Sequence, residues 1–329
     1  MHERLRGREW GDGWRRAAAG AVVALTLCGL SACAGSTGAG SAEAAPPPRS
    51  DPHEPRLAEP GCDAPSVIAH RGETGDGRKL PENSAAAELT AAAEGATYLN
   101  LDVRWTGDAV PVALHDATVG RTTSDLDPDT DVTSMTASQY TRLNARTYAG
   151  DTGQGSIIAA LHPQTLAQIL DAVARTGRPV IVQMEEDPFH SAGHPAQEFA
   201  SLARAVARSS AAARVIVAGW TLPDLAAFHT DDPHATLAYL FETIGADRYP
   251  DAAQIERVGA RILYVDYRGV TAPLVTQWHR QGLKVWVWTP AAPAQWQRMR
   301  ADGVDAIATD WAQAYLTWAL PSRPCGAQF

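Results

Sequence analysis

The sequence has few cysteines, an excess of acidic over basic residues and no apolar run long enough to span a bilayer. Four cysteines in 329 residues exclude a disulfide mini-protein. With 28 Lys+Arg against 37 Asp+Glu, the net charge is -9, which disfavours binding to nucleic-acid phosphates. Hydrophobic residues make up 45% and charged residues 20%, so a wholly disordered, collagen-like or coiled-coil chain is excluded. The length is sufficient for one large domain or two ordinary ones.

The first 33 residues have the pattern of an export signal. An arginine-rich flank precedes an uncharged run at 17–30, which is shorter than the roughly 20 residues of a membrane-spanning helix. The tetrad Leu30-Ser31-Ala32-Cys33 resembles a bacterial lipobox, in which the cysteine is lipidated and becomes the first mature residue. We predict a signal peptide over 1–32 and a lipid anchor on Cys33, at the extracytoplasmic side of the bacterial cell membrane. A secretory signal cut elsewhere is the alternative, and the export route stays open.

The mature chain is more acidic than the whole sequence. Cleavage before Cys33 removes five arginines and three acidic residues, which changes the net charge from -9 to -11. An acidic surface is repelled by anionic lipids, so we expect membrane contact only through the anchor. Residues 33–64 lack hydrophobic periodicity and contain Pro46-Pro47-Pro48, which is typical of a linker. The globular domain is predicted over 65–320 and a short tail over 321–329.

The remaining cysteines bracket the globular domain. Cys28 is lost with the signal and Cys33 takes the lipid, which leaves Cys62 and Cys325. An even remainder in an oxidising compartment predicts a disulfide between them. Two unpaired buried thiols are the alternative, because the sequence does not show that the two residues come within bonding distance.

Between these cysteines, short β-branched runs alternate with Ala- and Leu-rich stretches of helical spacing. Helices are predicted over 84–94, 165–176 and 272–281, each followed by a glycine suited to the end of a helix. Repeated strand–helix units indicate a parallel sheet, and about eight of them indicate a closed barrel. The nine strand candidates are 66–72, 98–105, 110–116, 179–185, 214–220, 235–241, 261–267, 284–290 and 305–310.

We therefore predict the α/β class with a single TIM-type (β/α)8 barrel, in which one candidate strand is surplus. The residues Gly107-Asp108 leave no room for a helix between the second and third candidates, so a tight connection is expected there. Residues 118–162 are rich in Asp, Thr and Gly and predict a long loop excursion over one end of the barrel. Chemistry in such barrels is located where the strands end, and polar side chains occur at several of these positions.

Five short motifs lie at these strand ends or just after them: Ile-Ala-His-Arg-Gly at 68–72, Pro-Glu-Asn-Ser at 81–84, Asn-Leu-Asp-Val at 100–103, His-Asp at 115–116 and Gly-Val-Asp-Ala-Ile-Ala-Thr-Asp at 303–310. They resemble the motifs of the glycerophosphodiester phosphodiesterase family, in the family's order. The family has a TIM-type barrel, acts on phosphodiesters with a glycerol-like alcohol and usually binds a divalent cation such as calcium or magnesium. The resemblance covers roughly residues 66–316.

The resemblance implies a role for each matching residue. His70 and His115 would exchange protons, since an unperturbed histidine pKa near 6.5 allows one to accept while the other donates. Arg71 would hold phosphate oxygens with its planar guanidinium, and Glu82 would orient Arg71. Asp102 would bind the cation. Satisfied core histidines are the alternative for either histidine taken alone.

The chain departs from the family at the expected cation ligands. Where the family has Glu-x-Asp and Glu-x-Lys, this sequence has Asn100-Leu101-Asp102 and Gln183-Met184-Glu185. Amide oxygens coordinate hard cations without supplying charge, so a site at these positions would bind calcium or magnesium weakly or not at all. Because Glu185 shares a strand face with Gln183, we expect its carboxylate to reach the cation from a shifted position.

Two further features have competing interpretations. Trp288, in the motif 287–289, is expected to form a wall of the substrate pocket, with core packing as the alternative. The segment 185–187 with His190 and His194 is either an additional source of ligands or, as its composition favours, a solvated loop.

Two functions follow from these observations. The first is an exported phosphodiester hydrolase that acts on glycerophosphodiesters or a related lipid-derived diester by His/His acid–base catalysis with a divalent cation. The second is a catalytically weakened phosphodiester-binding surface lipoprotein, favoured by Asn100 and Gln183. The expected partner is a small-molecule phosphodiester; neither nucleic acid nor a protein partner is indicated.

Overall fold

The computed structural model describes residues 64–75, 80–125, 127, 129–185, 194–243, 249 and 251–319. The chain divides into two compact units, Met1–Glu54 and Pro55–Phe329, and every described residue belongs to the second. The predicted signal peptide, the predicted lipidation site Cys33, the predicted linker and the predicted Cys62–Cys325 disulfide lie outside the described residues. Within the described part, no helix is long and apolar enough to cross a membrane.

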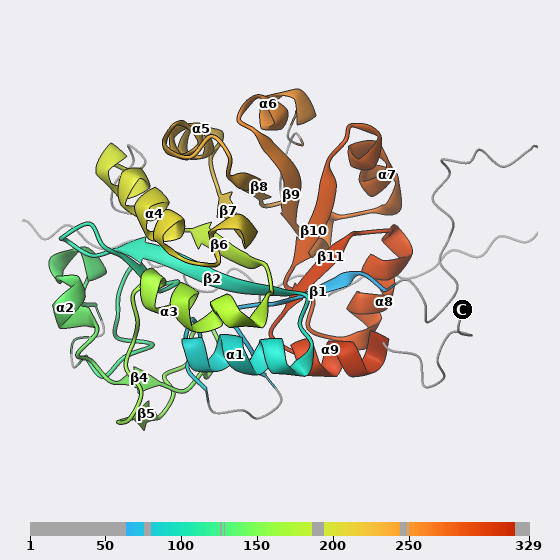
Figure 1. The fold of residues 1–329 in the computed structure, drawn as a ribbon. Helices are drawn as coiled ribbons and strands as arrows, with labels where there is room; N and C mark the ends of the chain where they lie inside the picture. Colours follow the sequence, from blue (N-terminus) through green and yellow to red (C-terminus); the bar gives the residue numbers. More distant parts are fainter. Residues whose placement is uncertain are drawn as a thin grey trace, which may run out of the picture. The chain divides into compact units, whose positions relative to one another are not determined.

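Eight parallel strands form a closed barrel, which confirms the predicted TIM-type (β/α)8 fold (Figure 1). The sheet runs in the order β1-β11-β10-β9-β8-β7-β6-β2, and pairing of Ile68 with Tyr98 and Ala69 with Leu99 closes it between β1 and β2. The barrel strands are β1 (Ser66–Ala69), β2 (Tyr98–Trp105), β6 (Val180–Met184), β7 (Val215–Gly219), β8 (Thr236–Phe241), β9 (Ala260–Asp266), β10 (Lys284–Trp288) and β11 (Ala306–Thr309).

Helices surround the barrel (Figure 1), and the predicted glycines lie at their ends. Gly95 adopts a left-handed φ of 103° at the end of the first helix, a conformation that glycine adopts without strain. The helices are α1 (Ala85–Glu94), α3 (Leu166–Val173), α4 (Ala196–Arg208), α5 (Leu222–Asp231), α6 (Ala252–Arg257), α7 (Ala272–Arg280), α8 (Pro293–Asp302) and α9 (Ala312–Ala319), and the 3₁₀ turns are η2 (Ala174–Thr176), η3 (Ala212–Arg214) and η4 (Tyr267–Gly269).

The surplus strand candidate is not part of the barrel. It forms β3 (Pro111–Ala113), which pairs antiparallel with the outer end of β2. The turn between them contains Gly107, where an added Cβ would lie 2.3 Å from the Thr133 carbonyl oxygen. The expectation that His115 and Asp116 end a barrel strand was therefore wrong. They follow a hairpin strand, because a connection of a few residues reverses the chain direction.

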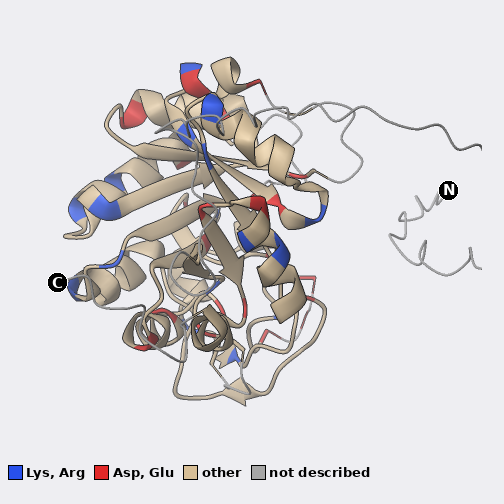
Figure 2. Cartoon of the chain, turned by 90° about the vertical axis from the view of Figure 1, so that its right-hand side faces the viewer, with Lys and Arg blue, Asp and Glu red and all other residues tan. Residues whose placement is uncertain are grey.

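Two apolar layers lie on either side of the strands. The larger lies between the strands and the helices, and it includes Leu99, Leu101 and Val103 on β2. The smaller fills the barrel and includes Ile68 and Ile181, since alternate side chains of a strand point to opposite faces. Most strand ribbons are tan in Figure 2, whereas blue and red segments occur mainly on helices and loops. Polar side chains on the inner face of a strand, such as Asn100 and Asp102 on β2, are therefore exceptions to the apolar pattern of the strands.

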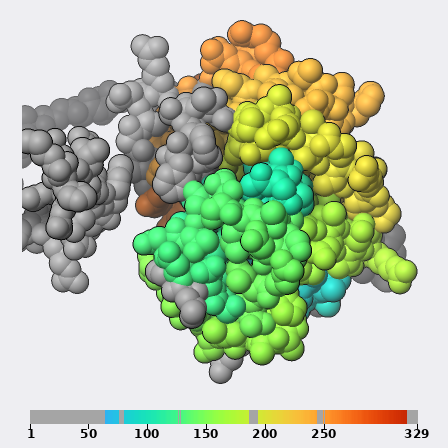
Figure 3. Space-filling model, turned by 90° about the vertical axis from the view of Figure 1, so that its left-hand side faces the viewer, coloured from blue at the N-terminus to red at the C-terminus, as the bar shows by residue number. Residues whose placement is uncertain are grey.

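The predicted excursion at 118–162 contains short elements and a small core of its own. Its elements are η1 (Val132–Ser134), α2 (Ala137–Tyr140), β4 (Ala145–Arg146) and β5 (Ile157–Ile158). Val119, Val132 and Tyr140 pack with Val112 and Leu114 in a separate apolar cluster. Figure 3 shows this green segment as a continuous lobe of the surface. The lobe contributes Tyr148 and Asp151 to the polar end of the barrel, as described below.

Candidate active site

The segment after β1 turns sharply and brings the predicted residue Arg71 next to Asn83, which belongs to the second motif. Arg71 has a left-handed φ of 57° and Asn83 one of 53°, which are sparsely populated conformations for residues with a side chain. The Asn83 amide donates to the Arg71 carbonyl at 3.0 Å. Gly72 lies against α1, and an added Cβ would lie 2.5 Å from that of Ala87. The turn therefore fixes the Arg71 backbone between β1 and the start of α1.

His70 is oriented by an aspartate on the neighbouring strand. Its Nδ1 lies 2.7 Å from Oδ1 of Asp310, which directly follows β11. Burial raises the pKa of Asp310. The charge and hydrogen bond of His70, together with Arg71 and Tyr148, lower the pKa by more than burial raises it, so it lies below its usual range. The carboxylate is thus ionised and only accepts. The Nδ1 atom must carry the proton, and Nε2 of neutral His70 is the nitrogen that can accept one.

His115 has a similar partner in its sequence neighbour. Its Nδ1 lies 2.8 Å from Oδ1 of Asp116, and Nε of Arg104 donates to the His115 carbonyl at 2.6 Å. Burial lowers the pKa of His115, but the hydrogen bond to Asp116 and the charges of Asp102 and Glu185 outweigh burial, so the pKa is raised above its ordinary value. His115 therefore retains its proton at a pH where an unperturbed histidine is mostly neutral.

Arg121 connects the His115 pair to Glu82. Its Nη1 and Nη2 donate to the two carboxylate oxygens of Glu82 at 2.8 and 2.7 Å, and Nη2 also donates to Asp116 at 3.0 Å. Such a bidentate arrangement uses the planar fork of arginine. Glu82 also accepts from Nη1 of Arg71 at 3.4 Å. The structure thus places Glu82 between two arginines, with its shorter contacts to Arg121.

Arg71 is surrounded by carboxylates. Its side chain is 5% exposed, and its Nε lies 2.9 Å from Oδ2 of Asp102. Its Nη1 donates to Asp151 of the excursion at 2.9 Å and more distantly to Glu82. Burial lowers the pKa of Arg71, but the charges of Asp102, Glu82 and Asp151 raise it above the ordinary value. The guanidinium therefore stays charged in the wall of the site.

Asp102 is fully buried, and only one of its two carboxylate oxygens accepts a hydrogen bond. Its Oδ2 accepts from Nδ2 of Asn83 at 3.0 Å, whereas its Oδ1 has no hydrogen-bond partner in the described part of the chain. Burial raises the pKa of Asp102, but the charges of Arg71, His115 and His70 lower it below its usual range. The carboxylate is therefore ionised, with one oxygen available to a ligand.

The amides at the predicted cation positions differ in their contacts. Asn100 is 0% exposed, and neither its Oδ1 nor its Nδ2 has a partner among the described residues. Gln183 pairs in register with Asp102 on the adjacent strand and donates from Nε2 to Glu185 at 2.6 Å. Burial and the charge of Asp102 raise the pKa of Glu185. Asp102 and Glu185 are therefore close enough to repel each other electrostatically.

These donors suit a weakly bound hard cation. The unpartnered Oδ1 atoms of Asp102 and Asn100 are buried oxygens of the kind that calcium and magnesium prefer. A bound cation would also relieve the repulsion between Asp102 and Glu185. The described residues contain no preformed group of three or more His, Cys, Asp and Glu ligands. The donor set therefore fits a cation held by one ionised carboxylate with help from amide oxygens.

A cavity of about 390 Å³ opens at this end of the barrel. It brings together the predicted residues His70, His115, Arg71, Gln183 and Trp288. The predicted residues Glu82, Asn100 and Asp102 are not among the residues that line it. The other lining residues are Asp151, Trp220, Leu240, Glu242, Tyr264, Arg268 and Thr289. The two histidines and the arginine thus face one substrate-sized space.

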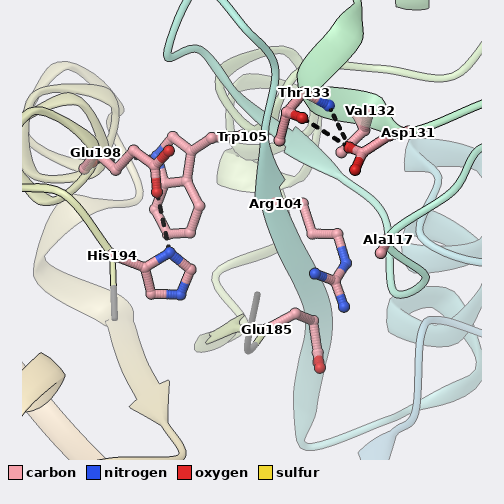
Figure 4. A pocket seen from close by; sticks show the side chains of 9 residues that line it. All are labelled: Arg104, Trp105, Ala117, Asp131, Val132, Thr133, Glu185, His194 and Glu198. Atoms are coloured by element: carbon pink, nitrogen blue, oxygen red, sulfur yellow. Dashed lines mark hydrogen bonds and ion pairs between the residues drawn. The ribbon is translucent and has the colours of Figure 1, made fainter. Parts of the chain in front are cut away.

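Glu185 lies in a smaller pocket beside the cavity. Figure 4 shows its side chain next to Arg104, with His194 and Glu198 on the other side of β2. His194 is 4.6 Å from the ring of Trp105 and binds Glu198 through Nδ1 at 2.9 Å. His194 is therefore packed and paired, which contradicts the solvated-loop interpretation for this residue, whereas its role as a ligand stays a prediction. The rest of that loop, 186–193, lies outside the described residues.

Several residues that the sequence analysis did not assign complete the site. Asp310 orients His70, and Arg121 holds Asp116. Asn83 donates from Nδ2 to the Asp102 carboxylate and accepts at Oδ1 from the Asp102 backbone N–H. Asp310 ends the last motif and Asn83 belongs to the second, so their positions carried a signal. Asp151 and Tyr264 lie in no motif, and only the fold places them at the cavity.

Comparison with known proteins gives a consistent result. The model of the "Glycerophosphoryl diester phosphodiesterase family" matches residues 70–314. A glycerophosphodiester phosphodiesterase from Caldanaerobacter subterraneus subsp. tengcongensis is 28% identical over 244 residues, which are 74% of this chain and 93% of the relative. Glycerophosphodiester phosphodiesterase 1 of Rattus norvegicus is 46% identical over a shorter stretch of 79 residues, 24% of this chain and 22% of the relative.

Solved structures share the fold. A phosphodiesterase from Oleispira antarctica, in complex with the product sn-glycerol-3-phosphate, superposes with a TM-score of 0.65 at 20% identity, covering 78% of this chain and 96% of that one. A glycerophosphodiester phosphodiesterase from Parabacteroides distasonis has a TM-score of 0.61 at 21% identity and covers 79% and 98%. These likenesses support the barrel assignment independently of the motifs.

Proposed function

The chain belongs to the glycerophosphoryl diester phosphodiesterase family, and on this basis we propose that it hydrolyses glycerophosphodiesters or a related lipid-derived diester to an alcohol and a phosphomonoester. The observation that carries this proposal is the cavity shared by His70, His115 and Arg71, in which each histidine is bound to its own aspartate. The product complex of the Oleispira antarctica relative is consistent with this substrate class.

The two histidines divide the proton transfers. His70 presents Nε2 as a base, because Asp310 holds the proton on Nδ1. It takes a proton from the attacking water as the new phosphorus–oxygen bond forms. His115, whose pKa is raised above the ordinary value, gives its proton to the alcohol oxygen as the old phosphorus–oxygen bond breaks. General acid–base catalysis of this type contributes typically about 100- to 10,000-fold.

Arg71 supplies positive charge to the phosphoryl group. Asp102, Glu82 and Asp151 hold its guanidinium in the cavity wall, so little side-chain freedom is lost when substrate binds. A fixed cation beside a developing phosphoryl charge stabilises the transition state more than a mobile one.

We also propose that a divalent cation, calcium or magnesium, binds weakly at Asp102, with Asn100, Gln183 and Glu185 as further oxygen donors. When bound, it would neutralise charge on the phosphoryl oxygens. The supporting observations are the unpartnered oxygens of Asp102 and Asn100 and the raised pKa of Glu185 beside Asp102. Calcium and magnesium titration of wild type and Glu185→Ala tests the contribution of Glu185, and equal affinities would contradict it.

The second candidate function is a catalytically weakened phosphodiester-binding lipoprotein. The observation that favours it is Asn100, whose buried amide occupies a position where the family supplies a carboxylate. In either case we propose export and attachment of the chain through lipid on Cys33. Metabolic labelling with a radioactive fatty acid tests this, and a Cys33→Ser variant that still incorporates label would contradict it.

Release of phosphomonoester and alcohol from a panel of glycerophosphodiesters tests the enzymatic proposal. The full-length chain is assayed with calcium, magnesium, manganese or a chelator. Turnover that disappears with chelator supports the cation, whereas turnover that persists supports a two-histidine mechanism without one. A folded chain that binds a diester but converts none with any cation would favour the second candidate.

A further inference from the structure

Tyr264 is a buried cavity residue with an unused hydroxyl group. It lies on the inner face of β9, in register with Leu240 on β8 and Trp286 on β10. Its side chain is 1% exposed and contributes to the lining of the cavity. Its hydroxyl oxygen has no hydrogen-bond partner in the described part of the chain.

Other buried tyrosines show how unusual this is. Tyr315 is also 1% exposed, and its hydroxyl donates to the Pro65 carbonyl at 2.7 Å. Tyr140, equally buried, donates to the Ala113 carbonyl at 2.9 Å. A buried hydroxyl without a partner has lost its hydrogen bonds to water and gained none in the fold, so an acceptor from a ligand would remove this penalty at Tyr264.

The charges around Tyr264 make its hydroxyl a donor. The charged groups that act on it are Asp102, Arg71 and Asp310, from three different segments at the end of the barrel. Burial raises the pKa of Tyr264, and the two carboxylates raise it further against the opposing effect of Arg71. The hydroxyl therefore remains protonated at every physiological pH, so it can donate a hydrogen bond to an acceptor that binds beside Arg71.

A second donor lies on the adjacent strand. Trp288 belongs to the same cavity, and its Nε1–H has no partner among the described residues. The indole nitrogen donates and cannot accept. Two neutral donors therefore face the space that Arg71 and the histidines also border, and oxygens of a phosphoryl group are acceptors suited to all of them.

We propose that Tyr264 donates a hydrogen bond to a non-bridging phosphoryl oxygen of the diester, with Trp288 Nε1–H as a second, weaker donor. This deepens the proposed function and depends on it for the identity of the substrate. The two neutral donors supplement Arg71 in a site that has fewer ionised cation ligands than the family pattern. The two donors, Tyr264 and Trp288, would bind a phosphoryl group whether or not the site hydrolyses a diester.

Tyr264→Phe and Tyr315→Phe form a matched pair for the test. Both remove one hydroxyl from a tyrosine that is 1% exposed, but only the first should affect ligand binding. Calorimetry on the full-length chain measures the affinity for sn-glycerol 3-phosphate and for inorganic phosphate. Urea unfolding of each variant measures stability.

We expect Tyr264→Phe to weaken sn-glycerol 3-phosphate binding about 10- to 100-fold, as for loss of a hydrogen bond to a charged group, without lowering the urea midpoint. Trp288→Phe should weaken it less. Tyr315→Phe should lower the midpoint and leave affinity unchanged. Unchanged affinity in Tyr264→Phe, or no binding of either probe by wild type, would overturn the proposal. A wild-type chain that binds the probe without hydrolysing any diester would refute the proposed function and leave the Tyr264 result interpretable.

Discussion

Histidine–aspartate pairs at the two ends of the barrel have nearly the same geometry but different surroundings. At the carboxyl end, the His70–Asp310 and His115–Asp116 distances are 2.7 and 2.8 Å. At the opposite end, His279 on α7 lies 2.8 Å from Asp305, just before β11. The exposed fraction of the side chain does not separate them either, since it is 35% for His115 and 34% for His279.

What distinguishes the two ends is the set of neighbours. His70 and His115 line a cavity with Arg71, whereas Asp305 also accepts from the Val285 amide at 2.7 Å and so secures the start of β10. A histidine–aspartate contact of nearly the same length therefore occurs at the cavity where we propose catalysis and, at the opposite end of the barrel, in a structural tie. The environment, not the pair, carries the functional information.

The largest expected difference between the two ends is in turnover. We expect His70→Ala and His115→Ala each to reduce kcat/KM for the preferred diester about 100- to 10,000-fold. His279→Ala should change it less than about 2-fold, because His279 pairs with Asp305 at the opposite end of the barrel and is not among the residues that line the cavity. Steady-state kinetics with the folded state checked by circular dichroism provides the measurement. Comparable losses of kcat/KM in all three variants would show that the two ends of the barrel do not differ in function.

Asp116→Asn should move the pH profile of activity. Loss of the carboxylate removes the interaction that raises the pKa of His115, so the acid loses its proton at lower pH. The alkaline limb of kcat/KM should therefore shift to lower pH, and activity at pH 8 should fall about 10-fold. Asp305→Asn, the matched change at the opposite end, should leave the profile in place. A profile that shifts equally in both variants would contradict the assignment of His115 as the acid.

Glu88 is a buried acid with no ion-pair partner among the described residues, and it tests how the stability of the fold depends on pH. It is 0% exposed on the first turn of α1. Burial and the charge of Asp102 raise its pKa well above the usual value, and a hydrogen bond from the backbone N–H of Asn100 opposes this only in part. The folded state then binds more protons than the unfolded state above about pH 4.5, so stability falls as pH rises. Glu88→Gln should gain about 1 kcal/mol in free energy of unfolding between pH 4.5 and 7.5, relative to wild type. Urea unfolding at both pH values measures the gain, and a pH-independent difference would contradict it.

The smallest effect is expected at the structural pair. The hydrogen bond to Asp305 raises the pKa of His279 against partial burial. A raised histidine pKa contributes stability that is present below the unfolded value near 6.5 and lost as pH rises through the folded value. His279→Gln should therefore reduce stability by about 0.5 kcal/mol at pH 5.5, a small figure because the pair is one-third exposed, and less at pH 8.5. Equal losses at both pH values would show that packing, not charge, is responsible.

Much of the architecture was predictable because its signals are local. Strand and helix periodicity, with glycines at 95, 177 and 282, depends on neighbouring residues in the chain. The short connection at Gly107-Asp108 correctly indicated an irregularity. That its second strand pairs antiparallel outside the barrel was less accessible, because β3 also satisfies the apolar pattern of a barrel strand.

The site was predictable only in part. Motif positions identified the histidines, Arg71 and Asp102, but not the division of Glu82 between two arginines or the contact of Asp151 with Arg71 across the excursion. Such contacts join residues 11 to 80 positions apart, and no local pattern specifies them. Likewise, nothing in the sequence separates Tyr264 from Tyr315.

The sequence alone contains the alternation of strands and helices, the order of the family motifs and the amides Asn100 and Gln183 at the predicted cation positions. These properties reside in residue type and spacing along one chain. The tertiary structure alone decided which histidine–aspartate pair faces a cavity, which carboxylates surround Arg71 and which buried hydroxyl lacks a partner. Burial, electrostatic coupling and hydrogen-bond satisfaction depend on distances between segments remote in sequence, and those distances exist only once the barrel has closed.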